Sequence, residues 1–208
     1  MKDRKLIIVG AGGHGGVAAD IAELTGYTEI VFLDDRVVDT SRVVGKTKDA
    51  VQYVADADFF VAIGDTDIRK RFFDQLTALD ARIINLIHPK ATVARSAVLG
   101  KGVLVAAGAV VGVNAVVGDG AIVNTCASVD HDCRIGMFVH VAVGTHIAGT
   151  VKIGDMTFVG AGTTVINGME IVKNCTIGAG TVVTKSILET GTYVGMPAHR
   201  VDKPIEGN

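Results

Sequence analysis

The stretch "VLVAAGAVVGVNAVVGDGAIVNTCASV", from Val103 to Val129, decides the fold because its pattern returns every six residues. The register begins at Ile87 and runs to Val183 without a break, and all seventeen positions on it carry an aliphatic side chain. A side chain that is usually small, such as alanine, cysteine or threonine, follows four residues after each position. A register of this length predicts a stack of short strands separated by tight turns.

Each repeat has room for one short strand. In Val103-Leu104-Val105 the outer two side chains point one way and the middle one the other, because side chains alternate along a strand. The aliphatic pair then faces a narrow interior, and the glycine that often follows it helps the chain to turn. The pattern predicts a parallel β-helix of hexapeptide repeats, a solenoid whose ends need caps.

The residues before the repeats have a different period. The strand-like segments "KLIIVG", "EIVFLDD", "DFFVAIGD" and "ARIINLI" alternate with helical stretches at Val17–Leu24 and Ile68–Leu79. This alternation predicts a small Rossmann-like α/β domain with a parallel sheet. We therefore expect two domains, residues 1–85 and residues 86–208, the second comprising the β-helix and a C-terminal tail.

Composition narrows the choice of partner and compartment. The 208 residues carry a formal net charge of -2, which gives no reason to expect nucleic acid or an anionic membrane as a partner. The apolar run in "MKDRKLIIVG" is too short for a signal peptide or a membrane span, so we expect a cytoplasmic protein. An odd number of cysteines, three, argues against a disulfide framework.

A glycine-rich loop, "GAGGHGG" from Gly10 to Gly16, joins the first predicted strand to the first predicted helix. Gly10, Gly12 and Gly15 fit the spacing G-x-G-x-x-G, and Asp34 follows nineteen residues later at the end of the next strand. Such a loop lets backbone amides approach a phosphate at a helix N-terminus. NAD, FAD or a nucleotide-sugar would fit, as would a turn without a ligand. The small domain, half of a complete dinucleotide fold, favours the nucleotide-sugar.

The stretch "VDHDC", Val129 to Cys133, is a polar interruption of the repeats. The register turns Val129 and Cys133 inward and leaves His131 projecting from a turn, between Asp130 and Asp132. A solvated corner is one interpretation. A second is a general base, because a neutral imidazole accepts a proton near pH 7 and an adjacent carboxylate raises its basicity. Either aspartate can supply that carboxylate.

Two further interpretations of this region are less favoured. A zinc site would combine His131 with His140 and His146, but six residues move the chain around the solenoid, so these side chains diverge unless neighbouring chains converge. We therefore expect no metal. A covalent route through Cys126, close in sequence to His131, is not specified by any Cys/His spacing.

Seven motifs, in order along nearly the whole chain, carry a resemblance to a known family: "GAGGHGG", "FLDD", "VAIGDTDIRKR", "NLIHP", "NTCASVDHDC", "IGMFVHVAVG" and "VGMPAHRV". The sequence resembles the nucleotide-sugar N-acetyltransferases of the bacillosamine and perosamine pathways, which are related to the sialic acid O-acetyltransferases. The resemblance implies a left-handed β-helix, with three hexads in each coil, so that residues eighteen apart stack. Asp132 stands where the bacillosamine enzyme has glutamate.

The resemblance also implies a role for individual residues. His131 matches the catalytic base and Asp132 the partner that tunes its basicity. Gly149 would stack beside His131 and leave space for its ring. The positions that match the acetyl-CoA site are His140, Gly149, Ala161, Gly178 and Gly180. The positions that match the nucleotide-sugar site are Gly12, Gly13, His14, Asp34, Asp35 and Gly64.

The resemblance implies an enzyme that transfers acetyl from acetyl-CoA to the 4-amino group of a UDP-linked amino-deoxysugar, in glycan biosynthesis. It implies a homotrimer with each active site between adjacent β-helices. The alternatives are a GDP-perosamine N-acetyltransferase, a sialic acid O-acetyltransferase that uses the same base on a hydroxyl, and a scaffold that binds a nucleotide-sugar without catalysis.

Overall fold

The protein is represented by a computed structural model, which describes residues 4–36 and 42–201. Its contacts divide the chain into two compact units, Met1–Pro89 and Lys90–Asn208. The fold class is the expected one, a small parallel α/β sheet followed by a parallel β-helix. Among the described residues, none of the helices combines the length and apolar character that crossing a membrane requires.

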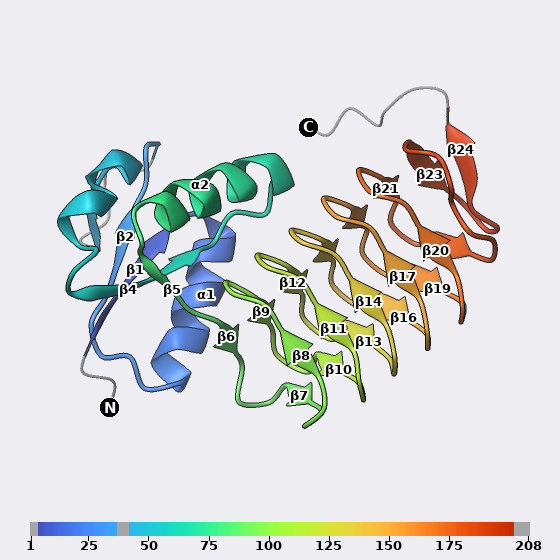
Figure 1. Cartoon of the computed structure of the whole chain (residues 1–208), viewed down its shortest axis with the longest axis horizontal. Coiled ribbons are helices and arrows are strands. Elements are labelled where there is room, and N and C mark those ends of the chain that lie inside the picture. The colour runs from blue at the N-terminus through green and yellow to red at the C-terminus, as the bar shows by residue number, and fades with distance from the viewer. Residues whose placement is uncertain (1–3, 37–41, 202–208) are drawn as a thin grey trace. The chain divides into compact units, whose positions relative to one another are not determined.

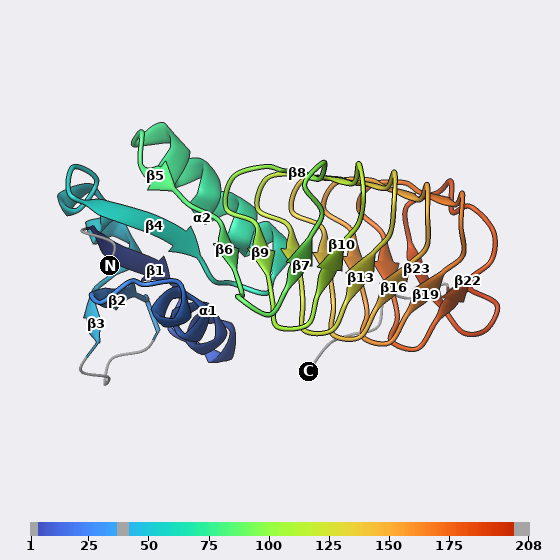
Figure 2. The same cartoon turned by 90° about the horizontal axis from the view of Figure 1, so that it is seen from below.

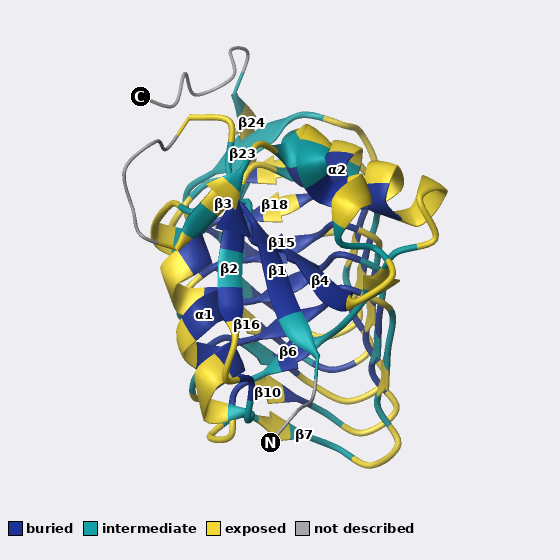
Figure 3. Ribbon diagram, turned by 90° about the vertical axis from the view of Figure 1, so that its left-hand side faces the viewer, coloured by how far each residue is buried: buried dark blue, intermediate teal, exposed yellow. Residues whose placement is uncertain are grey.

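The first unit is built on one parallel sheet with the strand order β3-β2-β1-β4-β5. The strands of this sheet are β1 (Lys5–Val9), β2 (Ile30–Leu33), β3 (Val43–Gly45), β4 (Ala57–Val61) and β5 (Arg82–Ile83). The next strand along the chain, β6 (Leu86–Ile87), is not part of it. β1 and β4 are almost wholly buried, as expected of parallel strands covered on both faces. Helices α1 (Gly13–Leu24) and α2 (Thr66–Ala78) lie on opposite sides of this sheet (Figure 3).

Both helices begin earlier than the periodicity predicts. α1 starts inside the glycine loop because Gly15 lies against the carbonyl oxygen of Gly10, an approach that any Cβ would block. α2 starts at Thr66 because the Asp65 side chain accepts a hydrogen bond from the Ile68 amide at 2.8 Å and so caps the helix. β3 and the 3-10 helix η1 (Thr47–Gln52) are not signalled by the sequence pattern.

The second unit is the β-helix, whose two-residue strands lie on three faces (Figures 1 and 2). The first face holds β7 (Thr92–Val93), β10 (Val110–Val111), β13 (Ser128–Val129), β16 (His146–Ile147), β19 (Thr164–Val165) and β22 (Val182–Val183). The second face holds β8 (Val98–Leu99), β11 (Val116–Val117), β14 (Arg134–Ile135), β17 (Lys152–Ile153) and β20 (Glu170–Ile171). The third face holds β9 (Leu104–Val105), β12 (Ile122–Val123), β15 (His140–Val141), β18 (Phe158–Val159) and β21 (Thr176–Ile177), and is extended by β23 (Thr192–Val194) and β24 (His199–Val201).

The hexad register predicts these strands correctly. Every one of the seventeen aliphatic positions is the second residue of a two-residue strand, from Ile87 in β6 to Val183 in β22. Neighbouring strands of a face pair in parallel with partners eighteen residues apart, such as Val111 with Val129. Three hexads therefore make one coil.

One backbone conformation recurs at every turn of the solenoid. From position 102 to position 180, each sixth residue has a positive φ, the left-handed conformation that the third residue of a type II turn requires. Half of these residues are glycine, and the others include Asn114, Asp132 and Asn174, with φ of 57°, 57° and 58°. Asn and Asp are the L-residues that tolerate this conformation best. Asp132 is therefore fixed at a defined point of its turn.

Candidate active site

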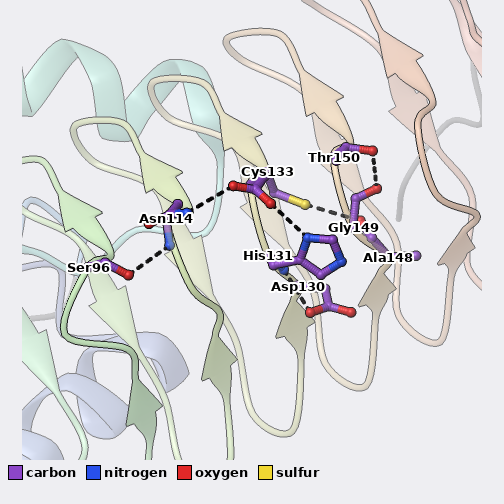
Figure 4. Close-up of polar contacts among 9 residues, drawn as sticks. Ser96, Asn114, Asp130, His131, Cys133, Ala148, Gly149 and Thr150 are labelled. Carbon is purple, nitrogen blue, oxygen red and sulfur yellow. Dashed lines mark hydrogen bonds and ion pairs between the residues drawn. The ribbon is translucent and has the colours of Figure 1, made fainter.

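His131 projects from the corner between β13 and β14, which we call the His131 corner (residues 130–133 and the stacked turns 112–115 and 148–151). Val129 and Cys133 are fully buried on either side of it, as the register predicts, and anchor the turn. His131 Nδ1 lies 2.8 Å from Asp132 Oδ2, whereas Asp130 Oδ1 accepts a hydrogen bond from the His131 backbone amide at 2.7 Å (Figure 4). Asp132 therefore orients the imidazole ring, and Asp130 orients the backbone.

This pairing determines which ring nitrogen carries the proton. A carboxylate only accepts, so the neutral imidazole donates from Nδ1 and keeps its lone pair on Nε2. The hydrogen bond to Asp132 raises the pKa of His131, and the negative charges of Asp130 and Asp132 add to the rise. The hydrogen bonds from His131 and from Asn114 lower the pKa of the Asp132 carboxyl. The pair is therefore an imidazole with a raised pKa beside a carboxyl group with a lowered pKa.

Gly149, eighteen residues after His131, lies against the imidazole. A Cβ at this position would stand 2.6 Å from His131 Cε1 and closer still to Nε2. The Thr150 amide donates to the His131 carbonyl at 2.9 Å, which holds the two turns together. A side chain at 149 would therefore displace the ring.

His140, in β15 on the third face, is 8% exposed and lies edge-on to Phe158, with ring centroids 5.3 Å apart. Its Nε2 lies 3.2 Å from Asn124 Nδ2, and Asn124 Oδ1 accepts the Thr125 amide at 2.8 Å. Because that amide identifies the oxygen of the carboxamide, the nitrogen faces His140 and can only donate. In this arrangement Nε2 of His140 accepts the hydrogen bond and the ring proton is on Nδ1. The sequence pattern does not predict Asn124 as a partner of His140.

The glycine loop borders a pocket of about 320 Å³ in the first unit. All six positions predicted to bind the nucleotide-sugar line it: Gly12, Gly13, His14, Asp34, Asp35 and Gly64. The structure thus brings together residues from the carboxyl ends of three neighbouring strands, β1, β2 and β4, the usual place for a ligand in a parallel sheet.

The two aspartates of this pocket hold loops in place. Asp34 accepts hydrogen bonds from the Ala11 and Arg36 amides, both at 2.7 Å. Asp35 accepts from the Thr47 amide at 3.0 Å and from its hydroxyl at 2.8 Å. Asp34 fixes the conformation of the glycine loop from the neighbouring strand.

Arg69, which the sequence pattern does not single out, lies next to Ile63 and Gly64 in the wall of this pocket. Its side chain is buried in α2 and donates to the carbonyls of Ile63 and Gly64 at 2.9 and 2.8 Å. Burial, with a contribution from the Arg69 charge, lowers the pKa of His14 to about 4. His14 is therefore neutral at physiological pH and offers a hydrogen bond without adding a charge. No periodicity in "TDIRKR" distinguishes Arg69 from its basic neighbours.

Known proteins share both units of this chain, the small α/β sheet and the β-helix. Residues 5–76 match the model of the PglD N-terminal domain. The acetyltransferase domain of PglB from Neisseria gonorrhoeae FA1090, solved in complex with acetyl coenzyme A, is 40% identical and superimposes with a TM-score of 0.92, covering 96% of this chain and 100% of that one. A variant of perosamine N-acetyltransferase from Caulobacter crescentus, solved with CoA and GDP-perosamine, is 32% identical with a TM-score of 0.92, covering 96% and 97%.

The chain belongs to the family of hexapeptide-repeat nucleotide-sugar N-acetyltransferases. A curated relative, the UDP-N-acetylbacillosamine N-acetyltransferase of Bacillus subtilis (strain 168), is 32% identical over 110 residues, and the match spans 49% of this chain and about half, 51%, of that enzyme. These relatives confirm the predicted family and, with it, the predicted enzyme class, an acetyltransferase that uses acetyl-CoA.

The positions predicted to bind acetyl-CoA fall in two places on the β-helix. Gly149 lies at the His131 corner. Ala161, Gly178 and Gly180 lie at the corner between the third and first faces, the corner that also holds Asn124, whereas His140 lies in β15 on the third face. The first face separates the two groups within one chain. The structure therefore does not bring His131 and His140 together in a single β-helix.

A hollow of about 610 Å³ runs along the first face of the acetyltransferase to the His131 corner. It is lined by Val110, Ser128, Asp130, His146, Ala148, Thr164 and Asn167, among others. His146 lies here with its Nδ1 2.9 Å from Ser128 Oγ. In residues 4–36 and 42–201, no three His, Cys, Asp or Glu side chains are arranged to hold a metal ion.

Proposed function

We propose that this chain transfers the acetyl group of acetyl-CoA to the 4-amino group of a UDP-linked amino-deoxysugar, in the biosynthesis of a glycan. The observation that carries the proposal is the His131–Asp132 pair, which keeps a lone pair on Nε2 at an exposed corner. The name of the Bacillus relative, a UDP-N-acetylbacillosamine N-acetyltransferase, supports UDP as the nucleotide.

His131 acts as the general base of a direct transfer. The sugar amine attacks the thioester carbonyl, a nitrogen–carbon bond forms, and the carbon–sulfur bond breaks. Nε2 of His131 accepts the proton that the amine loses, and this proton then neutralises the departing CoA thiolate. A general base contributes typically ~10²–10⁴-fold, and holding both substrates together supplies much of the remaining acceleration.

The first unit holds the nucleotide. The diphosphate lies against the amides of Gly12 and Gly13, where the N-terminus of α1 favours negative charge. Asp34 keeps the glycine loop in its binding conformation through the Ala11 amide. His14 adds a neutral hydrogen-bonding group, and Asp35 and Gly64 line the rest of the pocket.

The acetyl-CoA site is shared between two chains of a homotrimer. His140 presents Nδ1–H to the thioester carbonyl, where negative charge develops during attack. The backbone at Gly149, Ala161, Gly178 and Gly180 lines the groove for the pantetheine arm. The position of these residues on two corners of one β-helix supports a site that a neighbouring chain completes.

GDP-linked perosamine is the second candidate substrate, since the Caulobacter relative was solved with GDP-perosamine. The test is CoA release with acetyl-CoA and a panel of UDP- and GDP-linked 4-amino sugars, with free sialic acid as a control. We expect turnover with the UDP-linked amines. Turnover with GDP-perosamine alone would move the chain to the second candidate, and turnover with sialic acid alone would refute the amine as acceptor.

A further inference from the structure

A ladder of three stacked turns supports the carboxylate that orients His131. Ser96, Asn114 and Asp132 are spaced eighteen residues apart, so they lie on consecutive coils at the same corner. Figure 4 labels Ser96 and Asn114 on neighbouring coils. Ser96 Oγ accepts a hydrogen bond from the Asn114 amide at 3.0 Å. Asn114 Nδ2 donates to Asp132 Oδ1 at 3.1 Å. The ladder thus runs along the corner and ends at the imidazole.

The two oxygens of Asp132 have different donors. Oδ2 faces His131 Nδ1, and Oδ1 faces Asn114 Nδ2. Over the residues that the structure describes, these are the donors to this carboxylate, and half of the Asp132 side chain is exposed to solvent. Without Asn114 the carboxylate keeps, of these two contacts, only the one to His131, so its head group can turn about the Cβ–Cγ bond although its backbone stays fixed.

We infer that Asn114 is a positioning residue for the acetyl transfer and acts through Asp132. The inference rests on the proposed role of His131 as the base. A rotated carboxylate no longer fixes the Nδ1–H tautomer, and an imidazole with its proton on Nε2 cannot accept one from the sugar amine. Loss of the orienting carboxylate itself costs ~10⁴-fold in a serine protease triad. Asn114 is one hydrogen bond further from the imidazole, so we expect about a tenfold loss of kcat for its removal, the order of one hydrogen bond to a charged group.

Asn174 provides a matched control. It occupies the same left-handed position of its turn, with φ of 58° against 57° for Asn114, and is likewise exposed, but at another corner. Glycine occupies this position in half of the repeats, so Asn114→Gly and Asn174→Gly each remove a side chain without straining the backbone. We expect Asn114→Gly to lower kcat about tenfold with the KM for acetyl-CoA unchanged, and Asn174→Gly to leave both parameters unchanged.

A second pair of variants separates positioning from a general structural role. Asn114→Asp keeps a residue suited to positive φ but sets two carboxylates against each other, so it should lower kcat more than Asn114→Gly. In an Asp132→Ala background, Asn114→Gly should have no further effect, because the carboxylate on which it acts is gone. Wild-type kcat for Asn114→Gly, or an equal loss in the Asp132→Ala background, would overturn the inference.

The same assay includes His131→Ala. If that variant is inactive and Asn114→Gly is fully active, the positioning role fails and the proposed base stands. If His131→Ala retains full activity, the proposed base itself fails.

Discussion

Replacing Gly149 with alanine should disable the enzyme without unfolding it. An alanine Cβ would lie 2.6 Å from His131 Cε1 and 3.0 Å from Cδ2. Carbon atoms in contact settle ~3.5–4.0 Å apart, so the ring has to retreat by about 1 Å. The ring is exposed and can swing away, and Gly149 does not have a positive φ, so the fold loses little.

The expected cost to catalysis follows from that displacement. A misplacement of about 1 Å can cost ~10²-fold in rate, so we expect kcat to fall about a hundredfold. The assay is CoA release under saturating substrates, with acetyl-CoA affinity and the melting temperature measured on the same samples. Met137→Ala is the control, since Met137 is an exposed residue at the same point of another turn.

Two results would refute this reasoning. One is wild-type turnover for Gly149→Ala. The other is a further loss of kcat, at unchanged acetyl-CoA affinity, when Gly149→Ala is added to His131→Ala, because the imidazole that the new methyl group displaces is then gone.

Three further predictions concern the remaining parts of the site. The Asp132 hydrogen bond raises the pKa of His131, and a general base works when neutral, so kcat/KM should rise with pH through that pKa. Asp132→Asn should move this rise to lower pH and reduce the maximum value of kcat/KM. A rise that stays at the same pH would contradict the pairing. Asp34→Ala removes the acceptor for the Ala11 amide and should raise the KM for the nucleotide-sugar about tenfold, the order of a hydrogen bond to a charged group. The KM for acetyl-CoA should not change, and Asp20→Ala, at an exposed position, is the control. Cys126 lies at the same corner as Asn124 and not at the His131 corner, so Cys126→Gly should keep full turnover. Glycine suits the φ of 55° at this position. A folded but inactive variant would support the covalent route instead.

The solenoid was predictable because its energetics are local and repeated. Each coil buries the same aliphatic position, so an uninterrupted register from Ile87 to Val183 leaves little choice of structure. The same register correctly turned Val129 and Cys133 inward and His131 outward. The start of α1 was missed because tight packing of Gly15 on Gly10 overrides the low helix propensity of glycine.

The partners of the site residues were harder to predict than the residues themselves. Asn114 contacts Asp132 only because three hexads close one coil, so residues eighteen apart become neighbours. Asn124 reaches His140 across the following turn of the chain, sixteen residues away. Arg69 depends on the burial of one face of α2 against the end of β4. Such contacts follow from tertiary geometry, which the hydrophobic period specifies only in outline.

The measurement that tests the central claim most directly is the turnover of His131→Asn, with acetyl-CoA binding measured by calorimetry on the same preparation. If His131 is the general base, kcat falls by ~10²–10⁴-fold while the affinity for acetyl-CoA stays near that of the wild type. A folded His131→Asn enzyme that acetylates its sugar at the wild-type rate would contradict the account.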